Sequence, residues 1–251
     1  MLEVSGITQI FGGVTALDSV SFKIAKGDIT GVIGPNGAGK TTLFNIISGI
    51  YHQTAGTVYL EGKDVTGFPP ERLARLSMVR TFQNIELFGG MTVLENVMVG
   101  MHTKSTSGLL ACSFKAPWSI SEERRIRQGA LKWLDFTGIT DLADQKAGNL
   151  PFGKGRLLEI ARALAVEPRI ILMDEPAAGL NSQETLALAA LIKRIRDMDI
   201  TVVLVEHDME LVMDICDRIV VLNLGRKLAE GTPREIQDNH EVIAAYLGDD
   251  D

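Results

Sequence analysis

Apolar residues follow two different patterns near the amino end of the chain, and each pattern predicts a different element. In residues 15–24 (TALDSVSFKI) and 56–65 (GTVYLEGKDV) apolar and polar positions tend to alternate, which is typical of antiparallel strands bounded by turns. Between them, residues 28–34 (DITGVIG) form an apolar run that leads into a glycine-rich turn. Residues 40–49 (KTTLFNIISG) then have a helical period. A strand, a glycine-rich loop and a helix are therefore predicted in this order.

The middle of the chain has the period of helices. Residues 90–101 (GMTVLENVMVGM) and 121–139 (SEERRIRQGALKWLDFTGI) each place apolar residues on one helical face, and Ser121 is the expected N-cap of the second helix. A polar loop, residues 102–119, joins the two. We expect residues 84–150 to form a helical subdomain inserted into the rest of the fold.

After Leu150, apolar strands and helices alternate regularly. The predicted elements are a helix to Ala165, a strand over 169–175, a helix from Ser182, a strand over 201–207, a helix over 209–217 and a strand over 218–223. Strands this apolar are buried on both faces, as in a parallel sheet covered by helices. The predicted fold class is therefore α/β, with residues 1–83 and 151–251 as the core and an antiparallel β part near the amino end.

The last predicted helix carries a clear start signal. Thr232 precedes Pro233, which suits the first helical position, and Glu235 lies three residues after Thr232. A capping box with Thr232 as the N-cap is therefore predicted.

Composition and charge narrow the class of protein. The chain has 251 residues, 45% of them hydrophobic, which is enough for a well-buried core, and its formal net charge of -7 gives no general attraction for nucleic acid. No apolar run is long enough to predict a membrane span, and the first residues lack the basic-then-apolar pattern of a secretory signal. Cys112 and Cys216 have no metal-type spacing, so reduced thiols in the cytosol are expected.

The glycine-rich stretch supplies the first candidate chemistry. Residues 34–42 (GPNGAGKTT) fit the phosphate-loop pattern G-x-x-x-x-G-K-[ST] between a predicted strand and a predicted helix. Glycines let backbone N–H groups turn towards phosphate oxygens, and the helix that follows presents its positive dipole end to the same anion. The predicted nucleotide-binding residues are Gly34, Pro35, Asn36, Gly37, Ala38, Gly39, Lys40, Thr41 and Thr42.

Three side chains of this loop have separate expected roles. Lys40 is expected to reach the β- and γ-phosphates, Thr41 to place its hydroxyl on Mg²⁺, and Thr42 to contact the α-phosphate. The loop therefore predicts binding of a nucleotide's phosphates together with Mg²⁺.

Two acids end the strand in residues 169–175 (RIILMDE). An acid at the carboxyl end of a buried strand beside a phosphate loop holds Mg²⁺, usually through its waters, which is the role expected of Asp174. Glu175 is expected to point to the other side and to polarise the attacking water. Taken without the phosphate loop, the two acids would only end a strand.

Two further polar residues gain a role from their position. His207 follows the next strand, where its imidazole can bond a γ-phosphate. Gln83 lies at the junction with the helical subdomain, where its amide can contact Mg²⁺ or the attacking water and report the nucleotide state. Each would be an ordinary surface or packing residue if taken alone.

The phosphate loop, Gln83, the stretch at Leu150, the acid pair and His207, in this order, resemble the nucleotide-binding subunit of an ABC transporter. The resemblance spans nearly the whole chain and implies a P-loop ATPase core with an antiparallel β subdomain and a helical subdomain. It implies that Phe11 stacks on adenine, although a core aromatic is the other interpretation of Phe11. It also implies that two such subunits pair head to tail around ATP.

The resemblance assigns residues 150–156 (LPFGKGR) to the ABC signature, LSGGQ, which caps the nucleotide held by the partner subunit. The chain departs from that pattern: Pro151 replaces the Ser, Phe152 the first Gly, and Lys154 the Gln, whereas Gly153 keeps its place. Pro151 offers neither a hydroxyl nor an N–H group. Two interpretations follow: an altered cap that uses the charge of Lys154, or a weakened cap in an asymmetric pair.

The closing section, residues 205–248, together with residues 158–164 (LEIARAL) and 173–181 (MDEPAAGLN), resembles the ATPase subunits of branched-chain amino acid importers of the Liv type. This implies an ATPase on the cytoplasmic face of the inner membrane that energises permease subunits, together with a second related ATPase and, indirectly, a solute-binding protein. Related subunits that serve urea, amides or other polar solutes share most of these residues. A non-transport ABC ATPase acting on ribosomes or DNA is the other class, which the single phosphate loop and the acidic charge disfavour.

Overall fold

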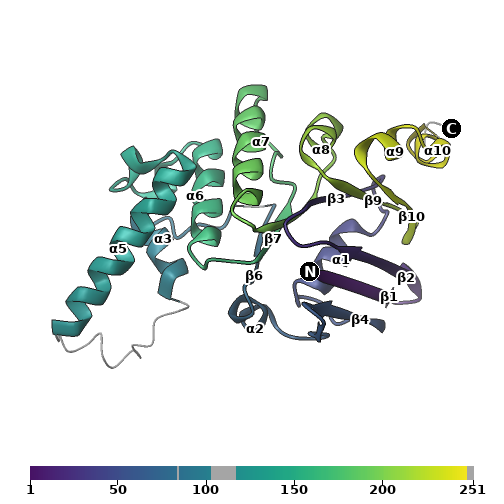
Figure 1. Cartoon of the computed structure of the whole chain (residues 1–251), viewed down its shortest axis with the longest axis horizontal. Coiled ribbons are helices and arrows are strands. Elements are labelled where there is room, and N and C mark those ends of the chain that lie inside the picture. Colours follow the sequence, from purple (N-terminus) through teal and green to yellow (C-terminus); the bar gives the residue numbers. More distant parts are fainter. Residues whose placement is uncertain (84, 103–116, 248–251) are drawn as a thin grey trace. The chain divides into compact units, whose positions relative to one another are not determined.

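The chain forms two compact units, seen in a computed structural model that describes residues 1–83, 85–102 and 117–247 (Figure 1). The first unit consists of Met1–Gln83 and Arg169–Asp251, and the second of Asn84–Pro168. The division after residue 83 is the predicted one, whereas the second division lies after residue 168 and not after residue 150.

The helix that follows residue 150 explains this second boundary. Helix α6 (Phe152–Leu164) packs against α3 (Val93–His102) and α5 (Pro117–Thr137), so the signature stretch belongs to the helical unit. The shared core of these helices includes Val97, Leu134 and Leu158.

A six-stranded sheet forms the centre of the first unit, in the order β10-β9-β3-β8-β7-β6. Its strands are β3 (Ile29–Ile33), β6 (Met78–Thr81), β7 (Ile170–Asp174), β8 (Thr201–Val205), β9 (Arg218–Asn223) and β10 (Arg226–Gly231). All neighbouring pairs are parallel except β9 with β10. Each of β3, β7 and β8 is buried along its whole length, as the apolar runs predicted.

Four adjacent strands of this sheet end at the same edge because they are parallel. In the order β3-β8-β7-β6 they lead into the phosphate loop, His207, the acid pair and Gln83. The register places Asp174 beside Val205, so the residues that follow β7 and β8 emerge next to each other. The sheet therefore gathers the predicted site residues at one edge, where ligands of open α/β sheets bind.

A separate four-stranded antiparallel sheet has the order β2-β1-β4-β5. Its strands are β1 (Leu2–Phe11), β2 (Val14–Ile24), β4 (Ala55–Leu60) and β5 (Lys63–Asp64). The predicted alternation in β2 and β4 is confirmed. Strand β1 lies between them but was not predicted, because Gly6 adopts a positive φ of 62° and three register shifts interrupt the alternation of β1 against β2.

Helix α1 (Lys40–Ile47) supplies apolar side chains to a core shared by the two sheets. Leu43 and Phe44 are buried with Leu2 and Val58 of the antiparallel sheet and with Val203 of the parallel sheet. Helix α2 (Pro70–Arg75) lies beside β6. The helix that begins at the phosphate loop is thus fixed by packing along its length.

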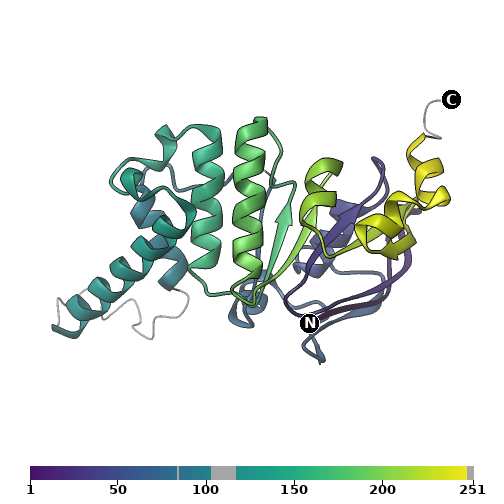
Figure 2. The same cartoon turned by 45° about the horizontal axis from the view of Figure 1, so that its top comes forward.

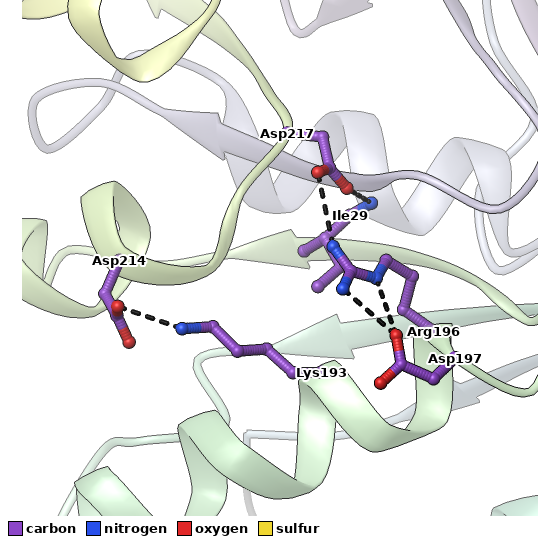
Figure 3. Close-up of polar contacts among 6 residues, drawn as sticks. All are labelled: Ile29, Lys193, Arg196, Asp197, Asp214 and Asp217. Carbon is purple, nitrogen blue, oxygen red and sulfur yellow. Dashed lines mark hydrogen bonds and ion pairs between the residues drawn. The ribbon is translucent and has the colours of Figure 1, made fainter.

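Helices α7 (Ser182–Arg196) and α8 (Met209–Ile215) cover the other face of the parallel sheet (Figures 1 and 2). Figure 3 shows polar contacts of α7: Lys193 Nζ lies 2.9 Å from Asp214 Oδ1 of α8, and Arg196 Nη1 lies 3.4 Å from Asp217 Oδ1, in the turn before β9. The second carboxylate oxygen of Asp217 accepts the N–H of Ile29 at 2.8 Å, at the start of β3. Asp217 therefore joins α7 to the strand that precedes the phosphate loop.

The chain ends in α9 (Pro233–Gln237) and α10 (His240–Leu247). The predicted capping box is confirmed: Thr232 accepts from the N–H of Glu235, and Glu235 accepts from the N–H of Thr232 at 2.7 Å.

The helical unit differs from the prediction at one helix start. Helix α5 begins at Pro117, so Ser121 lies within the helix and the prediction of Ser121 as N-cap was wrong. Short 3₁₀ turns, η1 (Thr140–Leu142) and η2 (Ala147–Asn149), connect α5 to α6. Most of the predicted polar loop, with Cys112, lies outside the described residues. Among the described residues, no helix combines the length and apolar character needed to cross a bilayer.

Helix α7 begins with a capping box whose loss is measurable. The Asn181 side chain accepts from the N–H of Glu184 at 3.0 Å, and the Glu184 side chain accepts from the N–H of Asn181 at 3.0 Å. Asn181→Ala removes the first bond and is expected to lower the free energy of unfolding by about 1 kcal/mol in chemical denaturation. Asn181→Asp keeps the acceptor and should stay close to the parent; equal losses in both variants would contradict this role.

Candidate functional site

Three glycines of the phosphate loop adopt backbone conformations that residues with a side chain rarely adopt. Gly34, Gly37 and Gly39 have φ values of 151°, 78° and 100°. A Cβ atom on Gly34 would lie 2.1 Å from the carbonyl oxygen of Leu222, and one on Gly39 would lie 2.8 Å from that of Ala16. The two glycines are therefore required both by conformation and by close packing against β9 and β2.

The start of α1 offers unsatisfied N–H groups. Gly39 is its N-cap, and no side chain caps the helix. Its first turn carries Thr41, which is exposed, and Thr42, which is half-buried, whereas Ala38 is buried beneath the loop. Exposed Asn36 and half-buried Pro35 complete the loop. Uncapped N–H groups at a helix start, with the dipole behind them, are a ready-made site for a phosphate group.

Lys40 folds back over the same loop. Its Nζ donates to the carbonyl oxygens of Gly34 at 2.6 Å and Pro35 at 2.9 Å. Burial lowers the pKa of Lys40, and the negative charge of Glu175 partly offsets this effect. The ammonium group is thus held at the mouth of the loop, within the electrostatic reach of Glu175.

Asp174 is held by an arginine that the sequence did not single out. Arg80, on β6, places one guanidinium nitrogen 2.6 Å from Asp174 Oδ2, and both side chains are less than a tenth exposed. The other terminal nitrogen donates to Asn45 Oδ1 at 2.8 Å and to Ser48 Oγ at 2.7 Å, at the far end of α1. A lone Arg within a strand has no motif, so only the three-dimensional contacts reveal its role.

Gln83, Glu175 and His207 meet at one carboxylate oxygen. The Gln83 amide nitrogen donates to Glu175 Oε2 at 2.7 Å, and His207 Nδ1 lies 3.8 Å from the same oxygen. The Glu175 side chain is 23% exposed and that of His207 is 66% exposed, so water reaches both. The structure therefore brings together three residues that were predicted separately, each from the end of a different strand.

The backbone of Glu175 is unusual for a residue with a side chain. Its φ is 44°, in the left-handed region, and its N–H donates to Val205 O at 2.9 Å. Residues other than Gly rarely adopt this conformation, and those that do often lie at functional sites. The conformation turns the chain sharply between Asp174, which is buried, and Glu175, which is partly exposed.

Phe11 is not a core aromatic. It lies at the end of β1 with 45% of its surface exposed, and its ring makes an edge contact with Tyr51 at a centroid distance of 5.8 Å. Tyr51, in the turn after α1, was not predicted. An exposed and braced aromatic ring suits stacking on a flat base.

The signature stretch forms the start of α6 in the helical unit. Pro151 is the N-cap without a side-chain bond, and the first turn contains Phe152, 49% exposed, with Gly153 and exposed Lys154. Behind them, Arg156 and Glu159 form a buried ion pair at 2.7 Å. The start of α6 thus has no side-chain cap and carries an exposed lysine in its first turn, which is compatible with both interpretations of the altered stretch.

The described residues offer neither a cluster of metal ligands nor a reactive thiol. They contain no group of three or more His, Cys, Asp or Glu side chains that could hold a metal ion. Cys216 is a buried free thiol, and burial raises its pKa to about 12, so it is inert at neutral pH.

Comparison with known proteins identifies the family. A profile described as ABC transporter matches residues 17–178, more than half of the chain. The chain belongs to the ABC transporter family. A second profile, described as branched-chain amino acid ATP-binding cassette transporter, matches residues 226–251. The predicted fold is confirmed, and this ABC transporter subunit is an ATPase.

Relatives resemble this ABC subunit along its full length. It is 48% identical over 250 residues to the high-affinity branched-chain amino acid transport ATP-binding protein BraF of Pseudomonas aeruginosa, covering 99% of this chain and 98% of BraF. It is 44% identical over 250 residues to LivG of Escherichia coli, which has the same description, with the same coverage.

Solved ABC cassettes share the fold. The ADP conformation of MJ1267, an ATP-binding cassette of an ABC transporter, has a TM-score of 0.86 at 36% identity, covering 99% of this chain and 98% of that one. A dimeric structure of MJ0796 bound to ADP and Pi has a TM-score of 0.79 at 28% identity, covering 93% of this chain and 99% of that one.

Lys40 provides a direct test of the phosphate loop. Lys40→Ala removes the ammonium at the mouth of the loop and is expected to lower ATP hydrolysis by about 100-fold or more, because the charge predicted to stabilise the γ-phosphate would be lost. Steady-state phosphate release and calorimetric ATP binding measure the effect. Lys193→Ala, which breaks only the contact with Asp214, is the control. Full retention of binding and hydrolysis in Lys40→Ala would defeat the assignment.

Proposed function

We propose that this ABC subunit hydrolyses ATP at Glu175 and uses the reaction to energise a membrane permease that imports branched-chain amino acids. The observation that carries the catalytic part is the convergence of Gln83 and His207 on Glu175 Oε2. The full-length similarity to LivG and BraF supports the transport part.

Glu175 is the proposed general base. Its carboxylate is partly exposed and lies where the amide of Gln83 can hold a water molecule and the imidazole of His207 can bond the γ-phosphate. As that water attacks the γ-phosphorus, Glu175 takes its proton and the bond to the bridging oxygen of the leaving ADP breaks. Lys40 and the N–H groups at the start of α1 stabilise the negative charge on the phosphates. Phe11, braced by Tyr51, stacks on the adenine.

Mg²⁺ fits the oxygen donors of this site. Thr41, Asp174 and Gln83 offer a hydroxyl, a carboxylate and an amide, and Mg²⁺ usually takes one or two carboxylates together with phosphates and waters. The ion would neutralise charge on the β- and γ-phosphates. Arg80 engages one oxygen of Asp174 and so orients the carboxylate for an indirect contact through water.

Two subunits are proposed to face each other around ATP. The start of α6, with Gly153 and Lys154, would cap the γ-phosphate bound to the other subunit through N–H groups, the helix dipole and the ammonium. The dimeric structure of the related MJ0796 cassette supports the pairing. The partner ATPase is either a second copy or a related subunit.

The permease would dock on residues 86–97 of the helical unit, at the cytoplasmic face of the inner membrane. Phe88 and Met91 are 48% and 39% exposed, and the Arg162 guanidinium lies over the Phe88 ring. Exposed aromatic and Met side chains are typical of interfaces. Because the helical unit follows Gln83 directly in the chain, a change at Gln83 would reach this surface.

Glu175→Gln tests the catalytic proposal. The amide cannot accept a proton, so turnover should fall by about 100-fold or more while ATP binding is retained. The variant should also accumulate as an ATP-bound dimer in size-exclusion chromatography. Glu61→Gln, at a surface ion pair with Arg169, is the matched control. Unchanged hydrolysis would show that Glu175 is not the base.

The same dimer measurement separates the two interpretations of the signature stretch. Lys154→Ala in the Glu175→Gln background should weaken the ATP-bound dimer if the ammonium helps to cap the nucleotide. An unaltered dimer would favour the weakened cap in an asymmetric pair.

A transport assay tests the import proposal. Cells that lack this subunit should lose uptake of labelled leucine, isoleucine and valine, and the parent chain, but not Glu175→Gln, should restore it. Restored uptake of urea or an amide instead would reassign the solute. Tight, salt-sensitive binding of RNA or DNA by the purified chain, without restored uptake, would overturn the transport role.

A further inference from the structure

Glu206 is a buried carboxyl group for which the proposed mechanism gives no role. It follows β8 directly, and the residue is only 1% exposed. Burial raises the pKa of Glu206, while backbone hydrogen bonds from Ala177, Asp208 and His207 act in the opposite direction. A carboxyl group buried at this depth costs stability unless its oxygens are bonded, so its presence calls for an explanation.

Three backbone N–H groups from two separate loops converge on this carboxyl group. Ala177 donates to Oε1 at 2.8 Å, whereas His207 and Asp208 donate to Oε2 at 3.0 and 3.3 Å. Ala177 belongs to the loop after β7, residues 175–181, and the other two belong to the loop after β8. One side chain therefore bridges the two loops, using a different oxygen for each.

Each of these loops carries a residue proposed to act on ATP. Glu175 begins the first loop, two residues before Ala177, and His207 is itself a donor in the second. The two side chains approach to 3.8 Å between His207 Nδ1 and Glu175 Oε2. Asp208 also caps α8 by accepting the N–H of Leu211 at 3.1 Å, so the second loop is anchored to the helix that follows it.

We propose that Glu206 is a positioning residue that fixes the separation of Glu175 and His207 by tying their loops together. The inference rests on the roles proposed for those two residues. The pairing of β7 with β8 places the ends of the two strands side by side, but it does not fix the conformation of the loops that follow them. The bridge supplies the missing constraint within the buried edge of the site.

The bridge requires a carboxylate of this length. Glutamine has nearly the same shape but only one acceptor oxygen, so its NH₂ group would face an N–H donor and either the Ala177 bond or the His207 and Asp208 bonds would be lost. Aspartate keeps both oxygens but withdraws them by about 1.5 Å, one carbon–carbon bond. Both substitutions therefore loosen one loop from the other.

Glu206→Gln and Glu206→Asp test the proposal together. Both should lower kcat for ATP hydrolysis by about 10- to 100-fold, the range typical of outer supporting residues and of small misplacements of reacting groups. ATP affinity should stay within about twofold of the parent, because most of the proposed ATP contacts come from the phosphate loop and Phe11, which are not part of the bridge. Hydrogen exchange at the amides of Ala177, His207 and Asp208 should become faster.

Thr201→Val is the matched control at the opposite end of the same strand. Thr201 is fully buried and its hydroxyl accepts the N–H of Gly27 at 3.0 Å, so the change also removes a buried side-chain acceptor for a backbone N–H group. It should lower thermal stability without lowering kcat.

If one Glu206 variant fails to fold, the other carries the test, because aspartate retains the charge and glutamine retains the length.

The outcomes separate this inference from the proposed function. A folded Glu206 variant with kcat within about twofold of the parent overturns the positioning role, even if Glu175→Gln is inactive. Parallel losses of ATP affinity, kcat and stability would also overturn it, because they indicate a structural role alone. Activity in Glu175→Gln would instead defeat the proposed base. A selective loss of kcat in Glu206→Gln supports the inference.

Discussion

The buried ion pair between Arg80 and Asp174 is the interaction on which the rest of the site depends. Both side chains are less than a tenth exposed, so water screens neither charge. Removing one partner of such a pair leaves the other charge unpaired and typically costs about 3–5 kcal/mol. The acid proposed to hold Mg²⁺ is therefore buried together with a guanidinium that the neighbouring strand supplies.

Arg80 also makes three parts of the site depend on one another. Through Asn45 and Ser48 it reaches the helix that begins at Lys40, and through Asp174 it reaches the strand that ends at Glu175. Its own strand ends two residues before Gln83. Glu206 plays a similar part on the other side of β7, where it joins loops through backbone groups. Two buried side chains, Arg80 and Glu206, each with several hydrogen-bond partners, thus hold this edge of the sheet.

The sequence predicted the elements of this fold better than the contacts between them. The apolar runs of β3, β7 and β8, the phosphate loop and the cap at Thr232 are local signals, because each depends on neighbouring residues. Arg80 and Asp174 are instead 94 residues apart, and Glu206 and Ala177 are 29 apart. Such pairs carry no periodicity or motif, so only the folded chain shows them.

Two local predictions failed for local reasons. Ser121 has the composition of an N-cap, but helix formation continues upstream to Pro117, a residue suited to a first helical turn. Strand β1 was missed because its bulges disturb the alternation on which the prediction relied. The cluster of Gln83, Glu175 and His207 was predictable in part. Each residue was identified from its place after a strand, but only the folded sheet shows that the three side chains meet.

The left-handed backbone conformation of Glu175 affects which substitutions would be selected for greater stability. At a φ of 44°, glycine or asparagine would relieve local strain, so a search for greater heat resistance would favour replacing this glutamate. Either replacement would discard the carboxylate on which Gln83 and His207 converge. Stability and the catalytic role proposed for Glu175 therefore favour different residues at this one position.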